Sequence, residues 1–235
     1  LRDLGYGTGL YKTPPYCAVK VPVFSFEKLT DANSYLSPEM KSTGEVLGIG
    51  KDMAEALFKG LVSSGIRLPH PGEETGVLLS VDEYDYFEVL ALARKFSDLG
   101  CRLYATSGTA AAISTLGIPV QTVEDIHEMS ATAALLESGA IHYIVYTGAL
   151  LDSTLDDYIA LHRKALLLNI ACLTSLDTAN ALADIIASRY NQMNTELVDI
   201  NHMRRERGRL RFAKMQSTGN DYIVIDNRSG ALVYP

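Results

Sequence analysis

Short apolar runs and amphipathic stretches alternate along the chain from residue 76 onward. The apolar runs read GVLLSV, RLYAT, VQTV, HYIVYTG and ACLTS, and longer stretches with apolar residues three or four positions apart lie between or after them. The short runs indicate buried strands, and the longer spacing indicates helices that pack on one side. We therefore expect an α/β fold, with a Rossmann-like parallel sheet that carries helices on both faces.

Three of the predicted helices carry clear apolar stripes, which we expect to form the core. The stripes consist of Val89, Leu92, Ala93, Phe96 and Leu99 in the first helix, Tyr158, Leu161, Ala165 and Leu168 in the fourth, and Ala179, Leu182, Ala183, Ile186 and Tyr190 in the fifth. Asp177 stands just before the last of these helices. We predict that its carboxylate caps the open amides of the first turn.

The first 75 residues have a different pattern. Residues 17–29, CAVKVPVFSFEKL, predict an extended strand with Pro22 at an edge or entry position. Residues 51–64 place Met53, Leu57 and Leu61 four apart, which predicts an amphipathic helix. The stretch IRLPHPGEETG, with two prolines and two glycines, then predicts a linker over residues 66–75.

The C-terminal stretch begins with a basic connector, HMRRERGRLR, whose residues 202–209 we assign as a linker. After it, LRFAKMQ and YIVIDNR flank STGND, which predicts a hairpin or strand-loop-strand unit.

Composition narrows the class of protein. The chain has 235 residues, of which 47% are hydrophobic and 21% charged, as is ordinary for a globular protein. No continuous apolar run is long enough to cross a bilayer and no signal peptide is seen, so we expect a cytoplasmic location without membrane contact. Three scattered cysteines indicate neither a disulfide framework nor a zinc site.

Charge is distributed unevenly. Residues 76–200 carry 6 basic and 16 acidic side chains, a net charge of −10, whereas residues 201–235 carry 7 and 3. A region this acidic repels polyanions, so we expect no nucleic-acid partner for it.

The candidate for chemistry is Thr106-Ser107-Gly108-Thr109, which joins a predicted strand to a predicted helix. Small residues, hydroxyls and a helix N-terminus suit a bound anion, although Ser and Thr also cap helices for structural reasons alone. Residue spacing alone does not decide between an anion site and a structural helix cap. The pair His127-Glu128 and the acidic run DSTLDD at residues 152–157 lack the spacing of a metal site, and we predict no metal there.

Residues 5–65, with VKVPVFSFEKL and SPEMKSTGEVLGIGKDMAEALFKGLVSSG, resemble the end of the second ATP-grasp half of the carbamoyl-phosphate synthetase large subunit. The next region, from GVLLSVDEYDYF to LTSLDTANALADII, resembles the allosteric domain of that subunit, a methylglyoxal-synthase-like sheet. The resemblance implies an ATP-grasp fragment over residues 1–65 and an allosteric domain over residues 76–201. Because the chain opens with Leu1, we expect a fragment of something longer.

The resemblance also implies an effector site. Thr106 and Thr109 match the family's effector-contacting T-x-G-T positions and Gly108 its turn glycine, and the family binds phosphorylated effectors such as uridine or inosine nucleotides. Two lysines that the family uses align with Tyr86 and Asp125, and the loop after the fourth strand is altered to Tyr146-Thr147-Gly148-Ala149-Leu150. An aspartate near a phosphate reverses the sign of the Coulomb interaction. We expect nucleotide control to be weakened or absent, or the effector to be less anionic.

For catalysis, the resemblance implies that the parent enzyme makes carbamoyl phosphate for pyrimidine and arginine biosynthesis from bicarbonate and glutamine or ammonia, using ATP with Mg or Mn. The family's E-x-N-P-R type motif is not found in residues 1–75, so we expect no cofactor and no activity in this stretch alone. The implied partners are the rest of the large subunit, the glutaminase small subunit and a possible small anionic effector. A free-standing lyase of the methylglyoxal-synthase class is disfavoured, because the G-P-L-G-G-D stretch of that enzyme is absent between Thr122 and Ala140.

The stretch RFAKMQSTGNDYIVID resembles the opening of diaminopimelate epimerase, so residues 210–235 are interpreted as the start of a fused epimerase domain, with an assembly artefact as the alternative. Asn220 matches the family's substrate-contacting asparagine, whereas Ser217 replaces the first glycine of its turn. A fusion would allow an alternative function, in which residues 76–200 serve as a docking module for the epimerase of lysine and cell-wall biosynthesis.

Overall fold

The computed structural model of the chain describes residue 9 and residues 13–25, 40–70, 72–123, 129–147, 155–200, 212–217 and 220–225. Its contacts divide the chain into two units. One unit runs from Tyr16 to Leu197, and the other combines Leu1–Pro15 with Val198–Pro235.

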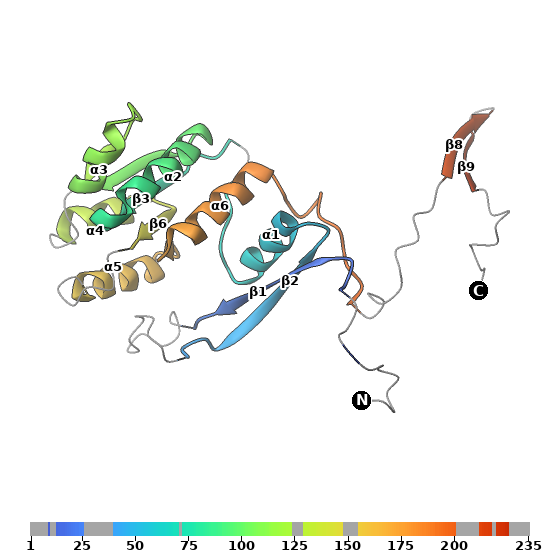
Figure 1. Ribbon diagram of the computed structural model, residues 1–235, viewed down its shortest axis with the longest axis horizontal. Coiled ribbons are helices and arrows are strands. Elements are labelled where there is room, and N and C mark those ends of the chain that lie inside the picture. The colour runs from blue at the N-terminus through green and yellow to red at the C-terminus, as the bar shows by residue number, and fades with distance from the viewer. Residues whose placement is uncertain are drawn as a thin grey trace. The chain divides into compact units, whose positions relative to one another are not determined.

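A five-stranded parallel sheet forms the centre of the first unit, in the order β5-β4-β3-β6-β7 (Figure 1). Its strands are β3 (Gly76–Ser80), β4 (Arg102–Thr106), β5 (Gln121–Val123), β6 (Tyr143–Tyr146) and β7 (Ala171–Leu173). Each strand falls within one of the five predicted apolar runs, and all neighbouring pairs are parallel. The predicted α/β fold is confirmed.

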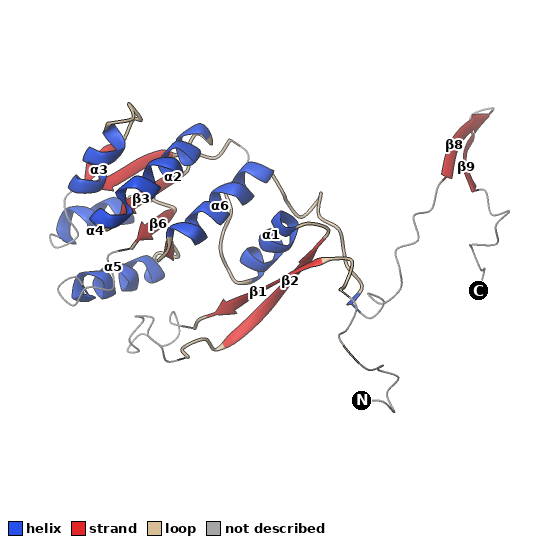
Figure 2. Cartoon of the chain, in the orientation of Figure 1, coloured by secondary structure: helices blue, strands red, loops and turns tan. Residues whose placement is uncertain are grey.

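Helices cover both faces of this sheet (Figure 2). They are α2 (Tyr86–Asp98), α3 (Ser107–Ser114), α4 (Met129–Glu137), α5 (Leu155–Leu167) and α6 (Leu176–Ser188), and a short 3₁₀ turn, Glu83–Asp85, precedes α2. Successive residues of β3 serve opposite faces: Val77 and Leu79 pack with α2 and α6, whereas Leu78 packs with α4 and α5. This alternation, with a period of two, builds one core on each side of the sheet.

The helical stripes confirm most of the predicted core, with corrections at Leu168 and Tyr190, and the predicted cap of α6 also differs. Tyr190 was predicted on the last helix, but α6 ends at Ser188 and Tyr190 lies beyond it, partly buried. Four residues of the first stripe, Val89, Leu92, Ala93 and Phe96, are fully buried in α2. Leu168 was predicted to be core, but α5 ends at Leu167 and Leu168 is 37% exposed in the following turn. Asp177 was predicted to be the N-cap of α6, but Ser175 is the cap, because its hydroxyl accepts from the Thr178 N–H at 3.2 Å.

The N-terminal part of the same unit is an antiparallel pair, β1 (Cys17–Val23) and β2 (Gly44–Gly50), covered by the helix α1 (Met53–Ser63). Pro22 lies opposite Glu45 in this two-stranded ribbon, in which both strands are edges. Helix and ribbon approach very closely: a Cβ on Gly48 would lie 2.0 Å from the Ala56 carbonyl oxygen. Only glycine fits at that position.

The face that α1 buries differs from the predicted stripe. Met53 is 55% exposed, while Glu55, Ala56, Phe58, Gly60 and Leu61 are buried. The burial of a glutamate within this face was not predicted.

In the second unit, β8 (Phe212–Ser217) and β9 (Asn220–Ile225) pair antiparallel, with Ser217 opposite Asn220. The two strands lie on either side of the centre of STGND, as the sequence predicts, and residues 218 and 219 between them lie outside the described residues.

Candidate functional site

The topology of the sheet indicates at which edge a ligand would bind. From β3 the chain moves outward to β4 and β5, and then returns to place β6 and β7 on the other side of β3. In open parallel sheets, ligands bind at the carboxyl ends of the strands where this direction changes. Here the place lies between the ends of β3 and β6, beside the start of α3.

Thr106 and Thr109 lie at this edge with their hydroxyls turned into the protein. Thr106 is 8% exposed and donates to the Ser80 hydroxyl at 3.2 Å. Thr109 is 1% exposed and accepts from the Val81 N–H at 3.1 Å. The two threonines therefore tie α3 to the end of β3, and their contact with an effector stays a prediction.

Ser107 and Gly108 are exposed at the first positions of α3, where backbone N–H groups have no partner within the helix. The Tyr86 hydroxyl lies directly against Gly108, since a Cβ built on residue 108 would be 2.2 Å from it. The resemblance aligns Tyr86 with a lysine of the family, and that alignment stays a prediction. A neutral hydroxyl thus lies beside the helix terminus where that alignment leads one to expect a cation.

Carboxylates face the same edge from the loop after β3. Thr147, which comes directly after β6, donates its hydroxyl to Asp85 Oδ2 at 2.5 Å and accepts from the Asp82 N–H at 3.0 Å. Asp82 Oδ1 accepts from the Tyr84 N–H at 3.1 Å. All these donors are uncharged, and no cation takes part in the bonds described at either aspartate.

The described segments that build this edge contain no lysine or arginine. They are residues 80–87, 106–110 and 146–147. Within these described segments, attraction for an anion comes from helix N-termini such as that of α3, and the charges of Asp82, Glu83 and Asp85 oppose it. The sequence interpretation missed this group, and the run Asp-Glu-Tyr-Asp directly after a buried strand was the signal that could have revealed it.

Several predicted residues are not brought to this edge by the described parts. Asp125, His127, Glu128, Asp152 and the stretch 148–150 lie outside the described residues. Asp156 and Asp157 lie in the first turn of α5, where the helix dipole favours acidic side chains. Asn220 opens β9 in the other unit, and its predicted contact with an epimerase substrate stays a prediction.

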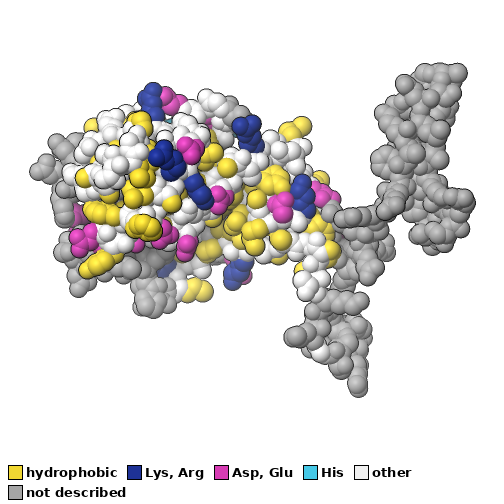
Figure 3. All heavy atoms as spheres, turned by 45° about the horizontal axis from the view of Figure 1, so that its top comes forward, with side chains coloured by type: hydrophobic (Ala, Val, Ile, Leu, Met, Phe, Trp, Pro, Cys, Tyr) yellow, Lys and Arg dark blue, Asp and Glu magenta, His cyan; other side chains and the backbone are white. Residues whose placement is uncertain are grey.

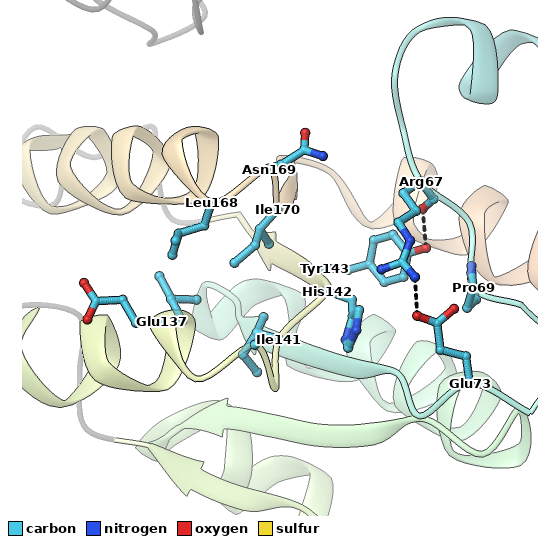
Figure 4. Close-up of a pocket in the computed structure, with 12 residues that line it drawn as sticks. Arg67, Pro69, Glu73, Glu137, Ile141, His142, Tyr143, Leu168, Asn169 and Ile170 are labelled. Atoms are coloured by element: carbon cyan, nitrogen blue, oxygen red, sulfur yellow. Dashed lines mark hydrogen bonds and ion pairs between the residues drawn. The ribbon is translucent and has the colours of Figure 1, made fainter.

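A hollow of about 230 Å³ opens at the amino edge of the sheet, opposite the edge described above (Figure 4). The Tyr143 hydroxyl donates to the Arg67 carbonyl oxygen at 2.6 Å, and Arg67 pairs with Glu73. His142 Nδ1 accepts from the Gly76 N–H at 3.1 Å. Burial raises the pKa of Tyr143, so its phenol stays protonated. The Tyr143 bond thus fastens the segment 66–75 to β6, and we interpret the hollow as part of that join.

Figure 3 shows basic side chains beside acidic ones, with hydrophobic side chains between them. Among the described residues, no three His, Cys, Asp or Glu side chains are grouped to hold a metal ion. No helix of the described part is long and apolar enough to span a membrane.

Comparison with known proteins gives a family match for part of the chain and similarity to larger proteins over most of it. Residues 88–174 match the family described as MGS-like domain. The carbamoyl phosphate synthase large chain of Lachnoclostridium phytofermentans is 43% identical over 185 residues, which is 77% of this chain and 17% of the relative. That of Clostridium botulinum is 40% identical over 186 residues, or 79% of this chain and 17% of the relative. The chain thus spans 17% of the length of these relatives.

Among solved structures, the chain is similar to methylglyoxal synthase from Elizabethkingia anophelis. The two are 15% identical, and the TM-score is 0.39 over 58% of this chain and 94% of the synthase.

Proposed function

Starting from the MGS-like domain that residues 88–174 match, we propose that the chain is the C-terminal regulatory region of a carbamoyl phosphate synthase large chain. The identity to large chains of that name over more than three quarters of the chain supports this assignment. Synthesis of carbamoyl phosphate, with ATP and Mg²⁺ or Mn²⁺, would take place in other parts of the longer protein. So would binding of a glutaminase subunit.

We further propose that nucleotide control is weakened in this protein. The observation that carries the proposal is the Tyr86 hydroxyl against Gly108, with Asp82 and Asp85 on the same edge. A phosphate approaching Ser107 and Gly108 would meet a neutral hydroxyl and two negative charges. A hydrogen bond to a charged group contributes about 1.5–3 kcal/mol, and the described segments of this edge offer no side-chain cation to make one.

Calorimetry with uridine monophosphate tests the proposal. The wild-type chain should show no binding in the micromolar range. The double variant Tyr86→Lys/Asp85→Asn should bind at least about tenfold more tightly, because 1.4 kcal/mol corresponds to a factor of ten. Micromolar binding by the wild-type chain would refute weakened control.

A matched control separates the local effect from overall charge. Glu88→Lys changes the net charge by the same two units as the double variant, but Glu88 is exposed on α2 two residues beyond Tyr86 and so lies on another side of the helix. It should leave uridine monophosphate binding unchanged. In the longer protein, an absence of carbamoyl phosphate synthesis would contradict the assignment itself.

We also propose that residues 210–235 begin an epimerase-like domain. The antiparallel pairing of β8 and β9, with Ser217 opposite Asn220, supports the strand and turn that the resemblance implies. A diaminopimelate epimerase assay on the protein encoded by the complete reading frame decides the matter. Activity that is lost on Asn220→Ala would support the fusion, and no activity would contradict it.

A further inference from the structure

A buried carboxylate joins the N-terminal α1 to the chain segment beyond α6. Glu55 is completely buried, yet its two oxygens accept from three donors. Oε1 accepts from the Glu196 N–H at 2.6 Å and lies 3.0 Å from the Lys59 Nζ, while Oε2 accepts from the Lys51 N–H at 2.9 Å. A buried charge is tolerated only when it is satisfied in this way.

Lys59, one turn further along α1, holds the other side of the same peptide segment. Its Nζ donates to the Glu196 carbonyl oxygen at 2.5 Å and to the Ile49 carbonyl oxygen at 2.7 Å. Glu55 and Lys59 therefore bind the N–H and the C=O of a single residue. Recognition of Glu196 through its backbone fixes the path of the chain there.

The same segment is fastened at its beginning. The Tyr190 hydroxyl donates to Asp52 Oδ2 at 2.8 Å, while Asp52 Oδ1 caps α1 by accepting from the Glu55 N–H at 2.8 Å. The Tyr190 ring lies 6.3 Å from that of Phe58, centre to centre. Residues 190–196, which we name the strap, are thus bound to α1 at both ends.

Ionisation agrees with this geometry. Burial, the largest single influence, raises the pKa of Glu55, but the hydrogen bonds from Glu196, Lys51 and Lys59 outweigh it and bring the pKa to about 2. Hydrogen bonding to Asp52 raises the pKa of Tyr190 to about 12, and bonds from Glu55 N–H and Tyr190 lower the pKa of Asp52. At neutral pH, Glu55 and Asp52 are charged acceptors and Tyr190 is a donor.

The strap follows α6, the helix that links the carboxyl edge of the sheet to α1. α6 begins directly after β7, at the carboxyl edge of the sheet, and runs for 13 residues, about 20 Å, before the strap starts. At its far end α6 lies against α1, which in turn covers the β1–β2 ribbon (Figures 1 and 2). One rigid helix therefore connects the candidate effector edge to the part that resembles ATP-grasp.

We propose that Glu55 and Lys59 form an anchor that, by gripping the backbone of Glu196, holds the strap and fixes α6 of the MGS-like domain against α1. The anchor sets the orientation of the MGS-like domain relative to the preceding part of the chain. This inference goes beyond the proposed function and does not depend on whether any effector binds.

Amide hydrogen exchange of the full chain, measured residue by residue, tests the anchor. The Glu196 N–H should be protected in the wild-type protein. In Glu55→Gln and in Lys59→Met it should exchange at least tenfold faster, while amides of β3 and β6 keep their protection. Glu88→Gln, the same change at an exposed position of α2, should leave Glu196 unaffected.

Two results would overturn the proposal. One is a Glu196 amide that exchanges at the unprotected rate in the wild-type protein. The other is equal protection of that amide in the wild type and both anchor variants. If an anchor variant loses protection throughout the sheet, Tyr190→Phe decides: it removes one hydroxyl of the strap and should speed exchange in residues 190–196 alone, and unchanged exchange there would refute the strap.

Discussion

Two polar clusters in this protein are both built on carboxylates, but only one of them contains a cationic partner. Around Glu55, a buried carboxylate meets a lysine and two backbone N–H groups, and the result is a fixed joint between segments 141 positions apart. At the carboxyl edge of the sheet, Asp82 and Asp85 meet only neutral donors among the bonds described. A carboxylate with a cationic partner stabilises the fold, whereas carboxylates without one keep a field that opposes anions.

The comparison bears on function because the second cluster lies where parallel sheets usually bind ligands. Its hydroxyls are used inside the protein: Thr106 and Thr109 hold α3 against the end of β3. In this structure the two hydroxyls are therefore engaged in bonds within the protein. Substitutions in the two clusters should therefore lower the free energy of unfolding by different amounts. The largest loss is expected at Glu55.

Glu55→Ala should be the most damaging change. It leaves two backbone N–H groups without their acceptor and removes the carboxylate beside Lys59, which keeps only its bonds to two carbonyl oxygens. Breaking a buried ion pair in this way costs about 4 kcal/mol. Urea unfolding of the variant should show that loss. Glu88→Ala, on an exposed position of α2, should change the free energy of unfolding by less than about 0.5 kcal/mol. Equal effects of the two changes would show that the buried Glu55 contributes no more to stability than an exposed glutamate does.

Acid should weaken the Glu55 cluster selectively. The pKa of Glu55 falls from the ordinary 4.5 to about 2 in the folded state, so the folded protein binds fewer protons than the unfolded one. The stabilisation from Glu55 is therefore complete above pH 4.5 and is lost as the pH falls toward 2, by about 3 kcal/mol in total. Unfolding curves between about pH 5 and pH 2.5 should fall more steeply for the wild type than for Glu55→Gln, and parallel curves would contradict the assignment.

Thr109→Val tests whether the hydroxyls of the carboxyl edge are structural. The change keeps the shape but leaves the buried Val81 N–H without its acceptor, which costs about 2 kcal/mol. Thr109→Ser, which retains the hydroxyl, should cost less than Thr109→Val. If Thr109→Val proves neutral in thermal unfolding, the threonine hydroxyl is available for a ligand instead.

Gly108→Ala should lower the stability by a smaller amount, and only while the Tyr86 hydroxyl is present. The new methyl group would lie 2.2 Å from the Tyr86 hydroxyl oxygen but 3.3 Å from the ring carbon that carries it. Overpacking of this kind costs about 1 kcal/mol, and Tyr86→Phe should relieve it. A double-mutant cycle measured by thermal unfolding gives the coupling directly. Additive effects would mean that Tyr86 does not rest on Gly108.

The sequence predicts the sheet well because each strand is a short apolar run and α2 has a regular period. Val89, Leu92, Ala93 and Phe96 needed only their spacing to be identified as core. Glu55 was missed because it lies on the polar side of a hydropathy pattern, and one of the donors that permit its burial comes from Glu196, far along the chain.

The sequence predicted where the candidate site lies but not the hydrogen bonds that its side chains make. The pattern placed Thr106, Ser107, Gly108 and Thr109 at a strand-helix junction, where the structure has them. Which way the threonine hydroxyls point depends on Ser80 and Val81, and the bond between Asp85 and Thr147 joins residues 62 positions apart. Such contacts belong to the folded sheet and leave no local pattern.

The most direct test of weakened nucleotide control monitors the Ser107 and Gly108 amides by NMR while uridine monophosphate is added at low salt. These are the exposed N–H groups at the start of α3, so a bound phosphate must shift their resonances. We predict that both signals stay in place up to millimolar nucleotide. Shifts that saturate in the micromolar range would show that the edge binds a phosphate in spite of Tyr86, Asp82 and Asp85, and would contradict the account.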